Sequence, residues 1–246
     1  MKVIPLSEGS FTIDATKKFI PFNTAEHDLQ ERSRGSLLVE IQPFLVQTEK
    51  DLILLDTGLG FLTEDGKMML HEHLIQAGIN PLSITKVLIS HLHKDHAGGI
   101  QYYDTQAQQT VLSFPNATYY VSAAELQFAL HSRNGSYTPK QFSLLDQHPK
   151  VNLLPASGVI DGYIRHEETA AHSPHHQVFW ITEDETFFYG GDDAPQHQQM
   201  KNRFVAKYDY DGKKAMELRT TWWKEAVSAH WIFLFYHDIK FPSIKA

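Results

Sequence analysis

The sequence contains no cysteine among its 246 residues. This absence excludes disulfide bonds, thiol nucleophiles and thiolate metal ligands. Any transition-metal site in this chain must therefore be built from imidazole and carboxylate groups, a donor set that suits zinc, iron, manganese or nickel.

Long apolar runs are also absent. No stretch of about 18 consecutive apolar residues occurs, so the sequence predicts no membrane-spanning helix. The N-terminal stretch contains Pro5 and early polar side chains instead of the apolar segment of a signal peptide. We therefore expect a cytoplasmic protein that does not bind a membrane.

Basic residues are fewer than acidic residues. The chain has 22 basic and 29 acidic residues, which gives a formal charge of −7 and argues against a nucleic-acid partner. We find no repeat, no low-complexity tract and no long flexible linker, so we expect residues 1–246 to form a single domain. The oligomeric state is left open.

Histidine, in contrast, is abundant, with 15 residues in the chain. The stretch VLISHLHKDHAGGI begins as an apolar strand and continues with His91, His93, Asp95 and His96. Residues two apart on extended chain point the same way, so His91 and His93 can converge on one metal ion. Asp95 and His96 follow the point where the chain begins to turn, and they can reach a second position nearby.

A second histidine pair, His71 and His73, has the same spacing but a different backbone. Apolar residues at helical intervals predict a helix over residues 67–77, ended by Gly78 and Pro81. Two helical residues this close in sequence point about 200° apart and cannot easily share an ion. We interpret this pair as part of a solvated helix face.

The sequence predicts groups of consecutive strands that are separated by helices. Apolar runs at 37–46 and 52–55 flank a polar turn and predict a hairpin, and a strand at 118–121 precedes a helix that starts at Ser122. A second hairpin is predicted around residues 183–185, followed by a helix over about 213–227 and a late buried strand in WIFLFYHD. This order predicts two sheets covered by helices.

Five sequence segments together resemble the metallo-β-lactamase superfamily. HLHKDHAGG is similar to the metal motif of this family, and the family's other motifs resemble ILLDTG, AAHSPHH, FFYGGDDAP and FLFYHD. The resemblance implies the fold class α/β of the α+β type, as a four-layer αββα sandwich, and a metal-dependent hydrolase.

The resemblance also implies a set of metal ligands. One ion is expected on His91, His93 and His172, a second on Asp95, His96 and His237, with Asp192 as the bridge. Asp193 is the alternative to Asp192, His230 is the alternative to His237, and His175 is a possible additional imidazole. Asp56, in the ILLDTG segment, is expected to form hydrogen bonds beneath the metal loop.

Two divalent transition-metal ions, zinc before iron, manganese or nickel, would generate a hydroxide near neutral pH. We expect this hydroxide to attack a small-molecule ester, lactone or related substrate, with Asp95 as the residue that carries a proton to the leaving group. The layout resembles lactonases and organophosphate hydrolases, although Pro195 stands where those lactonases commonly have tyrosine. The alternatives are a phosphodiesterase or nuclease of the same fold, and a metal-binding sensor without turnover.

Two polar segments, 132–150 and 23–35, are candidates for lids over the site. Aromatic residues in irregular segments or near motif ends are expected to belong to the core more often than to a substrate wall. These residues are Phe22, Phe142, Phe204, Trp222 and Trp223.

Overall fold

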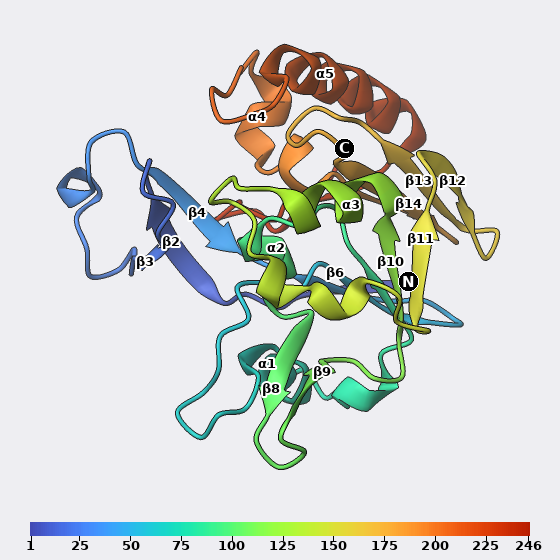
Figure 1. The fold of residues 1–246 in the computed structure, drawn as a ribbon. Coiled ribbons are helices and arrows are strands. Elements are labelled where there is room, and N and C mark those ends of the chain that lie inside the picture. Colours follow the sequence, from blue (N-terminus) through green and yellow to red (C-terminus); the bar gives the residue numbers. More distant parts are fainter.

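Two mixed sheets of six strands face one another in the computed structural model, which describes residues 1–246 (Figure 1). Sheet one has the order β1-β5-β6-β7-β10-β11, with the bounds Lys2–Pro5, Phe44–Gln47, Leu52–Leu55, Lys86–Leu88, Thr118–Ser122 and Val151–Leu154. Sheet two has the order β12-β13-β14-β15-β16-β17, with the bounds Ser157–Ile160, Ile164–Glu168, Gln177–Thr182, Thr186–Tyr189, Ile232–Leu234 and Ser243–Lys245.

Five α-helices and two small sheets complete the chain. The helices are α1 Met69–Gln76, α2 Lys94–Ala97, α3 Ala123–His131, α4 His197–Lys201 and α5 Gly212–Ala229. Strands β2 Gly9–Ile13, β3 Ile20–Pro21 and β4 Leu37–Ile41 form a sheet that projects to the left in Figure 1, and β8 Gln101–Asp104 pairs with β9 Gln109–Leu112. None of the helices is long and apolar enough to span a bilayer.

The apolar residues separate into three layers, as expected when both faces of each sheet are covered. Helices α1 and α3 pack on the outer face of sheet one, where Leu54 and Tyr119 meet Leu74 and Leu126. The facing sides of the two sheets form a second cluster, and α5 covers the outer face of sheet two through Trp222. The predicted αββα sandwich is therefore confirmed.

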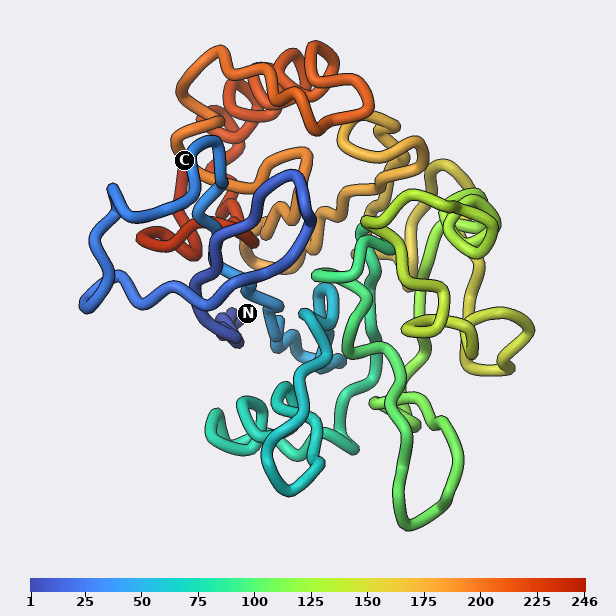
Figure 2. The backbone as a smooth tube through the Cα atoms, turned by 60° about the vertical axis from the view of Figure 1, so that its left-hand side comes forward, coloured from blue at the N-terminus to red at the C-terminus, as the bar shows by residue number.

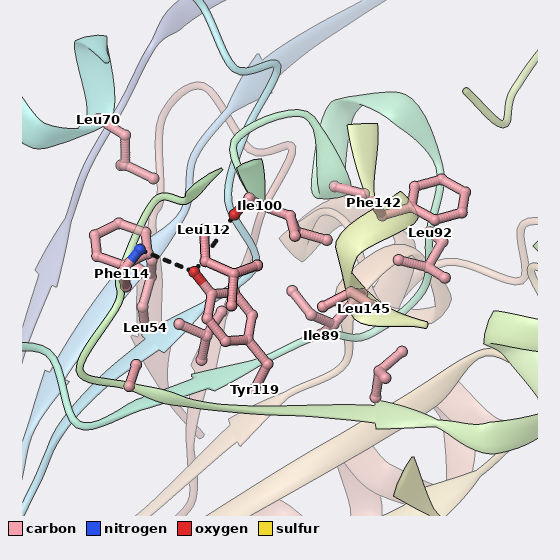
Figure 3. Close-up of a cluster of buried hydrophobic side chains, with 14 of the residues drawn as sticks. Leu54, Leu70, Ile89, Leu92, Ile100, Leu112, Phe114, Tyr119, Phe142 and Leu145 are labelled. Atoms are coloured by element: carbon pink, nitrogen blue, oxygen red, sulfur yellow. Dashed lines mark hydrogen bonds between the residues drawn. The ribbon is translucent and has the colours of Figure 1, made fainter. Parts of the chain in front are cut away.

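Buried polar groups within these layers have partners. The hydroxyl group of Tyr119 accepts a hydrogen bond from the backbone N–H of Phe114 over 2.9 Å and faces the carbonyl of Ile100 at 3.4 Å (Figure 3). Burying a phenol without such partners would cost free energy, so this pair fixes the loop between β9 and β10 against the sheet.

Most of the predicted elements are confirmed. Helix α1, the β14–β15 hairpin and α5 lie where the sequence placed them, and the Ser122 side chain accepts a hydrogen bond from the backbone N–H of Glu125 at the start of α3. The late apolar run is in a strand only over Ile232–Leu234.

The predicted hairpin is confirmed as β5 and β6, but the apolar run 37–46 is not a single strand. The run divides at Pro43 into β4, which pairs with β2, and β5, which pairs with β1 and β6. Proline has no N–H to donate to a ladder, and the chain changes sheets at this residue.

The prediction of a solvated face for His71 and His73 is also wrong. Both rings are half-buried, and the Nε2 atom of His71 lies 2.8 Å from the carbonyl oxygen of Ser113. The His71 ring also meets the Phe114 ring edge-on at 5.2 Å. His71 therefore joins α1 to the β9–β10 loop and lies in no metal-binding group.

Candidate metal centre

The central loop of the site leaves the carboxyl end of β7, which lies between its parallel neighbours β6 and β10. The chain runs through Ser90 and His91 to His93, and the short helix α2 then begins at Lys94. His91 and His96 are fully buried. Extended backbone before α2 and helical backbone within it aim the side chains in two directions, as the sequence predicted.

Glycines allow this loop to lie directly against the ILLDTG segment. A Cβ atom on Gly98 would lie 2.2 Å from the carbonyl carbon of Leu59, and one on Gly99 would lie 2.3 Å from the carbonyl oxygen of Thr57. The backbone N–H of Thr57 donates to the carbonyl of His96 over 2.7 Å. Close approach of the two backbones therefore explains why glycine occupies positions 98 and 99.

The remaining side chains reach the same place from the ends of other strands. His172 lies between β13 and β14, Asp192 lies in a 3-10 turn after β15, and His237 follows β16. Because these segments end at one edge of the sandwich, residues more than 140 positions apart in sequence meet at one site. The structure brings together all seven predicted ligands, which we call the histidine–aspartate cluster.

The first group of the cluster consists of His91, His93, His172 and Asp192. The Nε2 atom of His172 lies 3.2 Å from Nδ1 of His93 and 3.1 Å from Oδ2 of Asp192. Nε2 of His91 lies 4.0 Å from the same oxygen. Three ring nitrogens and one carboxylate oxygen therefore converge on one point.

The second group consists of Asp95, His96 and His237, and it faces the other oxygen of Asp192. Oδ1 of Asp192 lies 3.0 Å from Nε2 of His96 and 2.9 Å from Nε2 of His237. Oδ2 of Asp95 lies 3.9 Å and 3.6 Å from these nitrogens, respectively. Asp192 thus presents one oxygen to each group.

The cluster fits divalent metal ions. Nε2 of His91, Nε2 of His96 and Oδ1 of Asp192 are buried, and none of their close contacts within the protein has the geometry of a hydrogen bond, an arrangement that is costly unless another ligand satisfies these atoms. Imidazole nitrogens and carboxylate oxygens in groups of three or four are the donor set of a transition-metal site. The assignment of each residue as a ligand stays a prediction.

The protonation states of the cluster follow from its burial and its charges. Burial raises the pKa of Asp192, but His237, His96 and His172 outweigh burial and hold it well below its usual value. Burial and neighbouring imidazoles lower the pKa of His91 well below normal. Asp192 is therefore a carboxylate, and His91 is neutral with a lone pair available to a metal.

Hydrogen bonds from outside the cluster orient its imidazoles. Asp56 accepts from the backbone N–H of Ser90 at 2.7 Å, from the Ser90 hydroxyl at 2.6 Å and from the Tyr189 hydroxyl at 2.5 Å, and its Oδ2 lies 2.7 Å from Nδ1 of His96. The expected role of Asp56 beneath the metal loop is confirmed. His237 is held through Nδ1, which donates to the carbonyl of Glu40 over 2.7 Å.

Asp209 is a functional candidate that the sequence did not reveal. Its side chain is 1% exposed, and its Oδ1 accepts a hydrogen bond from Nδ1 of His172 over 2.8 Å. The adjoining Tyr210 donates its backbone N–H to the carbonyl of His172. Asp209 lies in an irregular segment without a motif, so only the folded chain brings it to the site.

The geometry separates the alternatives left open by the sequence. Asp193 faces away from the cluster, accepting hydrogen bonds from the His172 backbone N–H at 2.7 Å and from the Thr169 hydroxyl, and pairing with Nδ1 of His176 at 3.0 Å. His230 is exposed at the C-terminus of α5. His175 belongs to neither metal-binding group, and its ring lies beside Glu168.

A cavity of about 960 Å³ opens over the cluster, with His93, Asp95, His172, Asp192 and His237 in its floor. Figure 2 shows the N-terminal hairpin in blue and the segment after β15 in orange on the same side of the molecule, and both contribute to the walls. The walls include residues from 13–19, Phe128, residues 134–137 and 204–210.

This lining tests the predicted lids and aromatic residues. Part of segment 132–150 lines the cavity, whereas segment 23–35 contributes only Gly35. Residues 13–19 therefore take the place expected for 23–35. Phe142 and Trp222 are buried in the core as expected, but Phe204 is 41% exposed and lines the cavity.

Comparisons with known proteins point in one direction. The model of a family described as the metallo-beta-lactamase superfamily matches residues 40–219. No curated protein matches the sequence.

Several solved structures share the fold. A probable metal-dependent hydrolase from Staphylococcus aureus aligns with a TM-score of 0.79 at 21% identity, over 99% of this chain and 91% of that one. The hydrolase AbOPH, of the beta lactamase superfamily, aligns with a TM-score of 0.74 at 24% identity, over 99% of this chain and 89% of that one. The dizinc quorum-quenching lactonase AidC, in complex with its product, aligns with a TM-score of 0.72 at 21% identity, over 98% of this chain and 88% of that one.

Proposed function

This chain belongs to the metallo-β-lactamase superfamily and is a metal-dependent hydrolase, and we propose that it uses two metal ions to hydrolyse a small ester or lactone. The observation that carries the proposal is the division of the cluster into two groups joined by Asp192, at the floor of a cavity large enough for a small molecule. We also propose that residues 1–246 form a single domain, since both sheets share one apolar layer.

The protein residues prepare the site for this chemistry. Ions held by the first and second groups would lower the pKa of bound water and polarise the substrate's carbonyl oxygen. Asp192 is placed to fix the spacing of the two groups, because each of its oxygens faces one group. Zinc is proposed before iron, manganese and nickel, which the same donors suit; the dizinc composition of AidC supports this order.

Asp95 is the proposed catalytic residue. Its side chain is 12% exposed, lines the cavity and lies 3.6 Å from Nε2 of His237. A carboxyl group at the edge of the site can pass a proton to the leaving alkoxide. The hydroxyl group of Tyr236 donates to the backbone carbonyl of Asp95 over 2.5 Å, and the Tyr236 ring stacks on His96. These contacts hold Asp95 in a fixed position.

One experiment tests the proposal. The protein is reconstituted with zinc, analysed for bound metal, and incubated in parallel with p-nitrophenyl esters, γ-lactones and bis-p-nitrophenyl phosphate. We expect about two ions per chain and turnover of the esters or lactones. Turnover of the phosphodiester alone would make the protein a phosphodiesterase instead, and metal binding without any turnover would favour a sensor.

A further inference from the structure

Two lysine side chains, Lys17 and Lys94, line the cavity beside the histidine–aspartate cluster. Lys94 lies between two proposed ligands in the sequence, and Lys17 lies in the turn that joins β2 to β3. Both side chains are half-buried, and neither ammonium group forms an ion pair with a carboxylate. The cavity wall thus carries two positive charges that no protein carboxylate neutralises directly.

The contacts of these lysines hold them in place and leave hydrogen-bonding capacity. Nζ of Lys17 donates to Oδ1 of Asn134 and to Oγ of Ser136, each over 2.6 Å. Nζ of Lys94 donates to the backbone carbonyl of Lys17 and lies 5.6 Å from the centre of the Phe19 ring. An ammonium group has three donors, so Lys17 retains one and Lys94 retains two.

The carboxylates that line the same cavity are engaged elsewhere. Asp14 accepts hydrogen bonds from the backbone N–H and hydroxyl group of Thr16, and Asp209 accepts from His172. The other two carboxylates, Asp95 and Asp192, belong to the cluster. Partial burial of an unpaired charge is unfavourable, so an anionic group bound between the lysines would gain from both.

We propose that the substrate carries an anionic group, a carboxylate or a phosphate, at a distance from the bond that is cleaved. The ammonium groups of Lys17 and Lys94 bind this group, and the rest of the acyl chain lies along Phe19 and Tyr137. The Tyr137 ring meets His93 edge-on at 4.7 Å, so this path leads from the lysines to the metal cluster. The inference rests on the proposed ester or lactone hydrolysis and specifies its substrate class.

Matched ester pairs test the inference. Mono-p-nitrophenyl esters of succinic, glutaric and adipic acids are compared with p-nitrophenyl esters of butanoic, pentanoic and hexanoic acids, which have the same chain lengths without the charge. A parallel series that ends in phosphate separates the two sources of negative charge. We expect the anionic ester to have a kcat/KM about tenfold higher at one chain length.

The variants K17M and K94M should each reduce the ratio of kcat/KM for the anionic ester to kcat/KM for the neutral ester to about one. K18M is the matched control, because Lys18 is exposed and does not line the cavity; it should retain the ratio and the activity of the unmodified protein. Equal rates for charged and neutral esters at every length would overturn the inference while leaving ester hydrolysis intact. A loss in K17M and K94M that is confined to bis-p-nitrophenyl phosphate would also overturn it.

If no ester is hydrolysed, the proposed function fails and binding decides the inference separately. Calorimetry of succinate, glutarate and adipate with the zinc-loaded protein then measures affinity in the same set of variants. Weaker binding in K17M and K94M, but not in K18M, supports the lysine site. Equal binding in all variants, or no binding, overturns it.

Discussion

Nδ1 of His172 donates a hydrogen bond of 2.8 Å to the carboxylate of Asp209, which lies 37 residues later in the sequence. The other ring nitrogen of His172 faces Asp192 at 3.1 Å. A carboxylate on the far side of a metal-binding imidazole fixes the tautomer of the ring and its direction. With Nδ1 of His172 held by Asp209, Nε2 is the nitrogen that would bind a metal ion at the first group.

The variant D209A should bind metal at the first group more weakly, by roughly 10- to 100-fold. Competition with a chromogenic chelator measures this affinity. D211N is the matched control, because Asp211 lies two residues away and caps α5 by accepting from the backbone N–H of Lys214. Asparagine caps a helix about as well as aspartate, so D211N should change stability little and should leave the metal affinity unchanged. Equal affinity in D209A and the unmodified protein would disprove the role of Asp209.

Asp95 and Asp192 should differ in how many ions depend on them. Asp95 contributes only to the second group, whereas Asp192 faces both. After desalting, D95A should therefore retain about one ion per chain, and D192A should lose affinity for both. Elemental analysis and a two-phase chelator titration distinguish these results. D14N, which changes a cavity carboxylate outside the cluster, is the control; two ions retained by D192A would count against the bridge.

Much of this site could be predicted because its parts follow strand ends. In HLHKDH the backbone direction alone predicts that the side chains of His91 and His93 point to the same place, and the loop packs on the neighbouring ILLDTG segment. The distinction between Asp192 and Asp193 depends on one step of register. Adjacent carboxylates in a tight turn point in different directions: Asp192 faces the histidines of the cluster, whereas Asp193 pairs with His176 outside it.

The residues that the sequence did not reveal lie in irregular chain. Asp209 and Lys17 belong to no periodic segment, so neither helical nor strand spacing predicts where their side chains point. His71 shows a different failure, since its partner Ser113 lies 42 residues away and no pattern on α1 reveals it. Pro43 was a visible signal against a continuous strand, because proline cannot donate to a ladder.

Asp56 should stabilise the fold as well as orient His96. It is fully buried, accepts from the N–H and hydroxyl of Ser90 and from Tyr189, and has a φ of 54°. Asparagine tolerates this left-handed backbone, so D56N removes the charge without straining the chain. We expect D56N to lower the free energy of unfolding by about 2–3 kcal/mol. D56A should lower the free energy of unfolding by about 1 kcal/mol more than D56N, because a left-handed backbone is unfavourable for alanine.

Urea unfolding of the metal-free proteins measures these differences without any contribution from bound ions. The control is D104N, in which the altered carboxylate caps an exposed turn through the N–H groups of Gln106 and Ala107. A change below about 0.5 kcal/mol in D56N, within the range of ordinary surface substitutions, would show that Asp56 does not stabilise the fold.

The carboxyl group of Glu8 should make stability depend on pH. Burial raises its pKa from 4.5 to about 7, opposed by a hydrogen bond from the Leu59 backbone N–H and reinforced by the charge of Asp95. The folded protein therefore keeps a proton that the unfolded chain releases at lower pH. Between about pH 4.5 and 7 the folded state binds more protons, so the free energy of unfolding falls as pH rises through this window.

The variant E8Q should remove this component of the pH dependence. A neutral amide still accepts from Leu59 but carries no charge to bury, so E8Q should match the unmodified protein near pH 4 and exceed its stability at pH 8. The gain should reach roughly 3 kcal/mol, since one pKa unit corresponds to about 1.4 kcal/mol. Urea unfolding of metal-free protein across this range measures the difference, with E31Q as an exposed control. A constant difference between E8Q and the unmodified protein from pH 4 to 8 would show that Glu8 is ionised alike in the folded and unfolded chains.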